Sequence, residues 1–320
     1  MNLRCIKAPN TLIPFTDPRI RWPMFGSIKY DGHRMVSLRG VKFITPSGKD
    51  HVNRDIANHF SAFNRFCNEH NLVADGELWS PTRPFNELQS IVRTHDMTLP
   101  PDVGYYVFDL LTWDEWENRF QVRQYASRYG ELSMRIDHPN VYAVGQYLLC
   151  DARAAEEHYE IRLAEGHEGI MLRSPLGTYK HGRCTHLESH LLKFKNYVTE
   201  DAIIVGVEQM EVLKPGVERT VGPTGLLERT FRQEDHELAE AVGSFLVRQG
   251  DTTFKVKPGK GHTMEDRKRW WAERATLIGT GVEFSHMPHG AKDVPRIGSL
   301  VRFRPELAEE LPSHLLSRSL

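Results

Sequence analysis

The fold of this chain is constrained most by a change in hydrophobic pattern near Val198–Asp201. Beyond this point, short runs of β-branched and apolar residues alternate with turn residues, which predicts strands rather than long helices. We expect five short strands and one helix, at Ala202–Val207, Gly243–Arg248, Thr253–Val256, Gly281–Ser285, Ser299–Arg304 and, for the helix, Thr263–Thr276. This set is typical of a small all-β barrel such as the OB-fold.

The residues before the change mix helices with strands. Apolar side chains recur near helical spacing over Asn53–Asn68, and Asp151–Glu165 predicts a second helix with Asp151 as its cap. Apolar runs at Leu72–Trp79 and Tyr105–Thr112 predict buried strands. Because 320 residues give room for two domains, we expect an α+β domain over 1–198 and a barrel domain over 199–320.

Composition excludes several classes of protein. The 41 basic and 42 acidic side chains nearly cancel, so the chain lacks the strongly basic total of many nucleic-acid binders, although its lysines and arginines cluster locally. The four cysteines form no CxxC pair and the 16 histidines no HExxH motif, which argues against a zinc site or a disulfide framework. No run of about 18–20 apolar residues and no signal peptide are present, so a cytoplasmic location is expected.

The most informative short segment is Ile28-Lys29-Tyr30-Asp31-Gly32-His33-Arg34. A lysine at an apolar strand before an Asp-Gly turn is held in a fixed direction and is partly desolvated, which favours the neutral, nucleophilic amine. The alternative is an ordinary surface lysine before a hairpin turn.

Further segments carry residue types suited to binding a nucleotide. Carboxylates occur in Asp75-Gly76-Glu77 and at Glu168 before an apolar run, and Phe108 is an aromatic ring on a predicted strand. Lys193 and Lys195 alternate with apolar residues, so both lie on one face of a strand. Two ammonium groups on one face repel each other unless an anion such as phosphate lies between them.

In this order, the motifs resemble those of the ATP-dependent DNA ligases within the lysine nucleotidyltransferase superfamily. The resemblance extends from about residue 20 to 305 and includes a closing basic segment, Arg296–Arg304. It implies a nucleotidyltransferase (adenylation) domain followed by an OB-fold domain. It also implies the short phage or bacterial type of ligase, which seals 5′-phosphate/3′-hydroxyl nicks in duplex DNA.

The resemblance implies a role for each matching residue. Lys29 matches the nucleophile that becomes lysine–AMP, and Asp31 and Glu168 match the acids of the metal site. Lys193 and Lys195 match the pair that neutralises the α-phosphate of ATP. The remaining matches to the nucleotide site are Ile28 beside the nucleophile, Arg34, Glu77 at the ribose, Phe108 stacked on adenine, and Arg302 and Arg304 at the pyrophosphate.

Three segments depart from the pattern of the family. Ser27 stands where many relatives carry an acid, and Pro46 occupies a turn that often supplies an arginine to the nick phosphate. Recognition of the 5′-phosphate is therefore expected to depend on Arg34 and Arg173. The polar segment Lys214–Glu240 is expected to be a mobile insertion in the second domain.

The remaining expectations concern cofactors, partners and alternatives. The resemblance implies ATP as the AMP donor with Mg²⁺, or alternatively Mn²⁺, and nicked double-stranded DNA as substrate for a monomer in bacterial or phage-infected cytosol. Contacts to DNA are expected at Arg34, Arg173, Lys255, Lys257 and Lys260. The alternatives are an RNA ligase or mRNA guanylyltransferase of the same superfamily, and a catalytically inactive OB-type nucleic-acid-binding protein.

Overall fold

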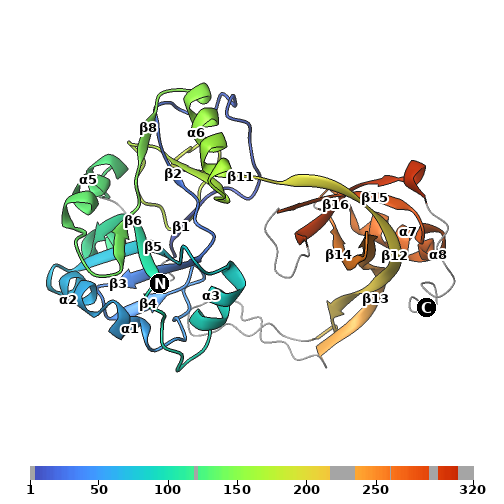
Figure 1. Cartoon of the computed structure of the whole chain (residues 1–320), viewed down its shortest axis with the longest axis horizontal. Coiled ribbons are helices and arrows are strands. Elements are labelled where there is room, and N and C mark those ends of the chain that lie inside the picture. The colour runs from blue at the N-terminus through green and yellow to red at the C-terminus, as the bar shows by residue number, and fades with distance from the viewer. Residues whose placement is uncertain (1–3, 119–121, 217–234, 260, 288–294, 309–320) are drawn as a thin grey trace. The chain divides into compact units, whose positions relative to one another are not determined.

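The computed structural model describes residues 4–118, 122–216, 235–259, 261–287 and 295–308 (Figure 1). The chain divides into two compact units, Met1–Lys195 and Asn196–Leu320. No helix among the described residues is long and apolar enough to cross a membrane.

The first unit contains a five-stranded and a four-stranded sheet. The five-stranded sheet has the strand order β4-β3-β5-β6-β7, with bounds Lys42–Ile44, His33–Leu38, Leu72–Trp79, Gly104–Thr112 and Val141–Ala143. The four-stranded sheet has the order β11-β9-β2-β8, with bounds Leu191–Lys195, Gly169–Arg173, Met24–Ile28 and Tyr147–Leu149. Two short strands, β1 (Ile6–Lys7) and β10 (Gly182–Arg183), pair in parallel.

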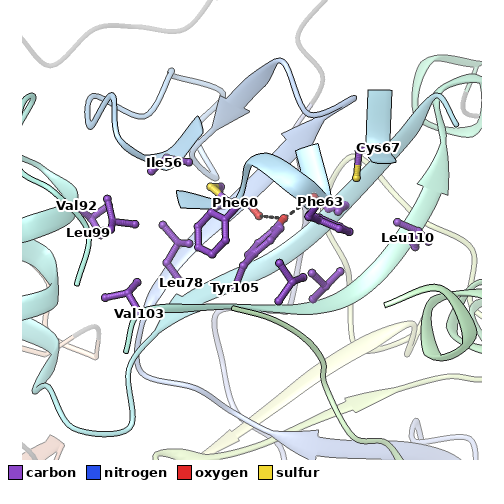
Figure 2. Close-up of a cluster of buried hydrophobic side chains, with 14 of the residues drawn as sticks. Ile56, Phe60, Phe63, Cys67, Leu78, Val92, Leu99, Val103, Tyr105 and Leu110 are labelled. Carbon is purple, nitrogen blue, oxygen red and sulfur yellow. Dashed lines mark hydrogen bonds between the residues drawn. The ribbon is translucent and has the colours of Figure 1, made fainter. Parts of the chain in front are cut away.

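Helices α1 (Ile56–His59), α2 (Ser61–Glu69), α3 (Phe85–Val92) and α5 (Tyr125–Arg135) pack their apolar side chains on one face of the five-stranded sheet. Helix α4 (Trp113–Asn118) buries Trp116 in a second core, and α6 (Ala152–Ala164) packs against the four-stranded sheet. Phe60 and Phe63 pack with Tyr105 in the apolar core beneath α1 and α2 (Figure 2). On β5, Leu72 and Ala74 enter this core while Val73 enters the second core on the opposite face, as strand alternation requires.

The predicted helices are present with altered bounds. Asp151 caps α6 by accepting a hydrogen bond from the Ala154 amide at 2.8 Å, as the sequence predicts. The single helix expected over Asn53–Asn68 is instead the two helices α1 and α2, which meet at Phe60. Strands β2 and β3 are both present, but they belong to different sheets and do not pair.

The second unit is a closed five-stranded barrel with strand order β12-β13-β14-β16-β15. The strands are Val198–Leu213, His236–Gln249, Thr252–Pro258, Arg296–Arg304 and Gly281–Met287, in that order. Helix α7 (Met264–Ala272) starts with a capping box at Thr263 and buries Trp270 against the barrel core. Helix α8 (Arg274–Leu277) and the 3₁₀ helix η2 (Pro305–Leu307) also belong to this unit.

Val198–Asp201, where the hydrophobic pattern changes, forms the start of β12 and pairs with β15. One expectation for this unit needs correction. The segment Lys214–Glu240 is not wholly an insertion, because His236–Glu240 belongs to β13, where Glu237 pairs with Val212 of β12. Residues 217–234 of that segment lie outside the described residues.

Candidate active site

Lys29 lies where the chain crosses from one sheet to the other. It follows β2 directly, and its amide donates to the carbonyl of Gly169 at 2.9 Å. Gly32, three residues later, passes so close to β5 that a Cβ there would lie 2.3 Å from the Leu78 carbonyl oxygen. The segment is therefore a crossover with a close backbone approach, and the alternative of a hairpin turn is wrong.

Glu168 lies between two lysine side chains. Its carboxylate forms ion pairs with the ammonium groups of both Lys29 and Lys195. Strand pairing explains the convergence: β9 lies between β2 and β11, Ile28 is paired with Ile170, and Lys195 lies opposite Gly169. Three residues far apart in the sequence therefore meet at the same end of three neighbouring strands.

Gly169 is essential to this meeting point. Its φ is +148°, and a Cβ at this position would lie 2.0 Å from the carbonyl oxygen of Phe194. Only glycine allows β9 and β11 to approach this closely beside Glu168 and Lys195.

The charge state of Glu168 reflects a balance of opposing effects. Burial alone would raise the pKa of this carboxyl group, but the positive charges of Lys29 and Lys195 outweigh burial and lower it. Glu168 is therefore an ionised, 7% exposed carboxylate held between two cations. Lys193 is half-buried on the same side of β11 as Lys195, since both alternate with the buried Leu192 and Phe194.

Glu77 on β5 lies close enough to Lys29 and Glu168 for their charges to act on its pKa. Burial raises the pKa of Glu77 to about 8, although the positive charges of Lys29 and Arg34 oppose the shift. Glu77 is therefore largely protonated at neutral pH and can both donate and accept a hydrogen bond. Asp31, in the crossover after Lys29, is half-buried.

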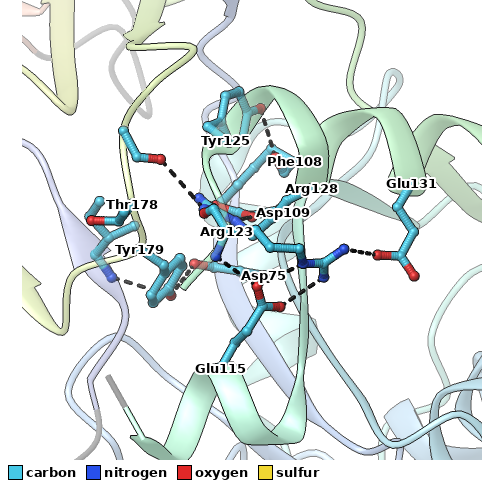
Figure 3. A network of polar contacts seen from close by, with 12 residues as sticks. Asp75, Phe108, Asp109, Glu115, Arg123, Tyr125, Arg128, Glu131, Thr178 and Tyr179 are labelled. Atoms are coloured by element: carbon cyan, nitrogen blue, oxygen red, sulfur yellow. Dashed lines mark hydrogen bonds and ion pairs between the residues drawn. The ribbon is translucent and has the colours of Figure 1, made fainter. Parts of the chain in front are cut away.

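Arg34 on β3 is held by a buried carboxylate. Its Nε and Nη2 atoms donate to Oδ1 and Oδ2 of Asp75, at 2.9 and 2.6 Å. The hydroxyl of Tyr179 donates to the same Oδ2 at 2.6 Å (Figure 3). Asp75 has no exposed surface, so these donors, rather than water, satisfy its oxygens.

Phe108 lies at an irregularity of β6. Asp75 of β5 pairs with Asp109 and Gly76 with Val107, so Phe108 is the extra residue of a bulge. Bulges re-aim side chains and occur often beside active sites. The guanidinium carbons of Arg34 and Arg173 lie 5.0 and 4.6 Å from the centre of its ring.

Asp109 binds two arginines next to this ring. It accepts from Nε and Nη2 of Arg128 at 2.7 and 3.0 Å (Figure 3). It also accepts from Nη1 of Arg173 at 3.3 Å. Arg128 is 1% exposed and Arg173 is 4% exposed. The two guanidinium groups share one buried carboxylate, so this cluster carries a net positive charge.

The remaining candidate residues belong to the barrel unit. Arg302 pairs with Glu283 at 2.7 Å, and Arg304 pairs with Asp201 at 3.4 Å and with Glu306. Lys255 pairs with Glu208 at 2.5 Å, and Lys257 is exposed on the same strand, β14. Lys260 lies outside the described residues.

The sequence of the first unit matches a known family. A family model described as "ATP dependent DNA ligase domain" matches residues 20–195, which is more than half of the chain. The chain belongs to the ATP-dependent DNA ligases. The matched range includes the residues from Lys29 to Lys195 and leaves strand β1 of this ligase outside it.

Solved structures share the fold of this ligase. A structure from work on Lig E DNA ligases is 22% identical and has a TM-score of 0.63, with 95% of this chain and 99% of that chain covered. A chain named Pmar-Lig is 19% identical with a TM-score of 0.71, over 94% of this chain and 67% of its own. Chlorella virus DNA ligase-adenylate is 23% identical with a TM-score of 0.50, over 95% and 99% of the two chains. No curated protein matches the sequence.

Sequence reasoning missed three groups that build the site of this ligase. Asp109 and Asp75 had a detectable signal, because a carboxylate inside an apolar strand must be paired when it is buried. Arg128 comes from helix α5, in a segment for which no helix was predicted. Nothing in the sequence indicated that it pairs with Asp109.

Proposed function

We propose that this ATP-dependent DNA ligase seals 5′-phosphate/3′-hydroxyl nicks in duplex DNA through a Lys29–AMP intermediate. The observation that carries this proposal is the contact of Lys29 and Lys195 with the same carboxylate of Glu168. This arrangement places an amine and a second cation next to each other, as attack on a phosphate requires.

The proposed first step forms a phosphoramidate. The neutral amine of Lys29 attacks the α-phosphorus of ATP, the P–N bond forms, the bond to pyrophosphate breaks, and the amine loses its proton. Lys193 and Lys195 neutralise the charge that develops on the α-phosphate oxygens. Arg302 and Arg304 of the barrel orient the leaving pyrophosphate.

The nucleoside is recognised by the residues of β5 and β6. Glu77 hydrogen-bonds the ribose, and its high pKa gives it a proton to donate at neutral pH. The ring of Phe108 stacks on adenine, and the main chain at Ile28 lies at the nucleotide beside the nucleophile. The guanidinium groups of Arg34 and Arg173 then border the base-binding ring.

The second and third steps transfer AMP and close the nick. An oxygen of the 5′-phosphate attacks the phosphorus of lysine–AMP and forms the new P–O bond. The P–N bond breaks, and the nitrogen of Lys29 takes up a proton and leaves as the amine. The 3′-hydroxyl then attacks the activated 5′-phosphate, loses its proton, and releases AMP. Arg34 and Arg173 bind the 5′-phosphate in these steps.

The acidic residues of the site fit a magnesium ion, with Mn²⁺ as an alternative. Among the described residues, no group of three or more His, Cys, Asp or Glu side chains could hold a metal. Mg²⁺ does not need one, since it binds through one or two carboxylates and takes other ligands from water and phosphate. Asp31 and Glu168 would hold it, and it would supply further neutralisation of phosphate charge.

The barrel is inferred to be an OB-fold that contacts DNA. Its order β12-β13-β14-β16-β15, which is 1-2-3-5-4 by position in the chain, supports this assignment. Lys255 and Lys257 on β14, together with Lys260, would bind phosphates of the duplex. One nick presents one site, so a monomer is expected to suffice.

Sealing of defined nicks tests the proposed function. A labelled duplex with a 5′-phosphate nick should be joined in the presence of ATP and magnesium, while the same duplex with a 5′-hydroxyl should not. Joining of only an RNA nick, or labelling by GTP in place of ATP, would favour the RNA ligase or guanylyltransferase alternatives. No joining and no labelling would favour the inactive binding protein.

A further inference from the structure

The N-terminal strand β1 is connected to Arg34 by a chain of hydrogen bonds. The amide of Ile6 donates to the hydroxyl of Tyr179 at 3.2 Å. That hydroxyl donates to Oδ2 of Asp75 at 2.6 Å, and Asp75 binds the guanidinium of Arg34 through both oxygens. Four groups from four separate parts of the sequence therefore form one continuous chain of hydrogen bonds, called the relay below.

Three of the four members of the relay are shielded from water. Ile6 is 2% exposed, Tyr179 is 3% exposed, and Asp75 has no exposed surface. Water therefore cannot easily replace a lost donor, and a buried carboxylate with a missing donor is costly. Each link is needed to satisfy the next.

The direction of the relay is fixed by chemistry. An amide can only donate, and an ionised carboxylate can only accept, so the hydroxyl of Tyr179 must accept from Ile6 and donate to Asp75. Burial and the nearby charge of Asp75 raise the pKa of Tyr179, so its hydroxyl keeps the proton that it donates.

Strand β1 lies against the same group of charges. Cys5 and Ile6 pack with Val36 and Val73 in the apolar core on the inner face of the five-stranded sheet. The charges of Arg34, Asp75 and Glu77 all act on the pKa of the Cys5 thiol, although burial is the main cause of its rise. Strand β1 and the adjacent Cys5 therefore lie next to the charged residues of the site, although they precede the part of the chain that matches the family.

We propose that Tyr179 and the amide of Ile6 are positioning groups that orient Arg34 for binding the 5′-phosphate. They act through Asp75: with the hydroxyl in place, Oδ2 has two donors and the carboxylate is fixed. Without the hydroxyl, the carboxylate can rotate about its bond to Cβ, and the guanidinium rotates with it. This inference rests on the role proposed above for Arg34.

Tyr179→Phe tests the proposal, because it removes the hydroxyl and retains the ring. Two rates should be measured separately: self-adenylylation with ATP, and closure of a nick that already carries AMP on its 5′ end. Loss of one hydrogen bond to a charged group should slow nick closure about tenfold. The apparent KM for the nick should rise, with a smaller change in the rate at saturation.

Tyr129→Phe is the matched control. Its hydroxyl also accepts from a backbone amide, that of Gln146 at 3.2 Å, and it does not contact Arg34 or Asp75. It should lose a comparable amount of thermal stability while closing nicks at the wild-type rate.

A double-mutant cycle separates positioning from stability. If Tyr179 acts through Arg34, then Tyr179→Phe should not slow nick closure any further in an Arg34→Ala background. The inference would be overturned if Tyr179→Phe slowed nick closure by the same factor in the Arg34→Ala background as in the wild type. It would also be overturned if Tyr179→Phe alone closed nicks at the wild-type rate. Normal closure by Arg34→Ala alone would instead overturn the proposed role of Arg34.

Ile6→Pro tests the relay from its other end. Proline lacks the amide proton and leaves the phenol in place. Ile6→Pro should raise the apparent KM for the nick by a smaller factor than Tyr179→Phe does. An unchanged KM in a folded Ile6→Pro protein would show that the amide of Ile6 does not position Arg34. If Tyr179→Phe failed to fold, the KM of Ile6→Pro would be the measurement that tests the proposal.

Discussion

Asp75 and Asp109 are paired directly across strands β5 and β6, and each buried carboxylate holds one arginine of the site. Asp75 binds Arg34, and Asp109 binds Arg173. Both guanidinium groups lie over the ring of Phe108. One pair of carboxylates thus orients the ring proposed to bind adenine and the two cations proposed to bind the 5′-phosphate.

The first prediction concerns the buried cation behind Asp109. Replacing Arg128 with Met removes the two hydrogen bonds that a 1% exposed guanidinium donates to Asp109, and leaves Asp109 with Arg173 alone. Breaking a buried pair from one side should lower the free energy of unfolding by about 3 kcal/mol. Chemical denaturation measures this loss.

Arg153→Met is the control for that measurement. Arg153 also pairs with a carboxylate, that of Glu157 at 2.9 Å, but its side chain is 88% exposed. An exposed pair of this kind should contribute less than about 0.5 kcal/mol. Equal losses for the two variants would contradict the importance of the buried pair.

The second prediction concerns Gly169. An alanine there would place a Cβ against the Phe194 carbonyl and force β11 away from β9. Lys195 would then leave Glu168, and a displacement of about 1 Å can cost roughly 100-fold in rate. Self-adenylylation of Gly169→Ala should therefore fall by about that factor.

Gly130→Ala provides the comparison. Gly130 lies inside helix α5, and a Cβ there meets no atom within 4 Å. This change should stabilise the protein by about 0.5–1 kcal/mol and leave adenylylation unchanged. If Gly169→Ala were as active as Gly130→Ala, the close approach of β9 and β11 would not be required.

The third prediction is a pH dependence of stability that arises from Glu77. Its pKa is raised from 4.5 to about 8 by burial, so between these values the folded state holds a proton that the unfolded state releases. The unfolded state therefore binds fewer protons, and the contribution of Glu77 to stability falls as the pH rises through this window. Above the folded pKa, the ionised carboxylate destabilises the fold by a constant amount.

Glu77→Gln isolates this contribution, because glutamine does not titrate. The melting temperature of the variant minus that of the wild type should increase steadily from about pH 5 to about pH 8. A difference that stays constant over this range would show that burial does not raise the pKa of Glu77.

The fourth prediction concerns Lys257, one of two exposed lysines on β14. If Lys257 contacts a DNA phosphate, Lys257→Ala should weaken binding of nicked DNA equally for all sequences. The slope of log K against log salt should decrease in magnitude by about 1. Lys42→Ala is the control, since Lys42 is an exposed lysine paired with Asp50 at 3.2 Å. The same slope for wild type and Lys257→Ala would exclude the contact.

The elements that could be predicted are those with local signals. The order of the motifs from Lys29 to Lys195 was sufficient to identify the family, which the match over residues 20–195 confirms. The cap at Asp151 is a short-range feature of adjacent residues, and the sequence predicted it correctly.

The elements that could not be predicted depend on distant parts of the chain. The Asp31-Gly32 pair has the composition of a hairpin turn, and only the pairing of β2 with β9 and of β3 with β5 shows that it joins two sheets. Tyr179 lies outside regular structure, so no periodicity indicates that its hydroxyl reaches Asp75. The bulge at Phe108 is likewise a property of strand pairing and has no signal in the sequence of β6.

The most direct test of the central claim is transfer of label from α-labelled ATP to the protein, with magnesium and without DNA. Wild type and Lys42→Ala should acquire an acid-labile, base-stable adenylyl group, while Lys29→Ala should acquire none. Labelling of Lys29→Ala at the wild-type level would contradict the account, because the nucleophile would then be another residue.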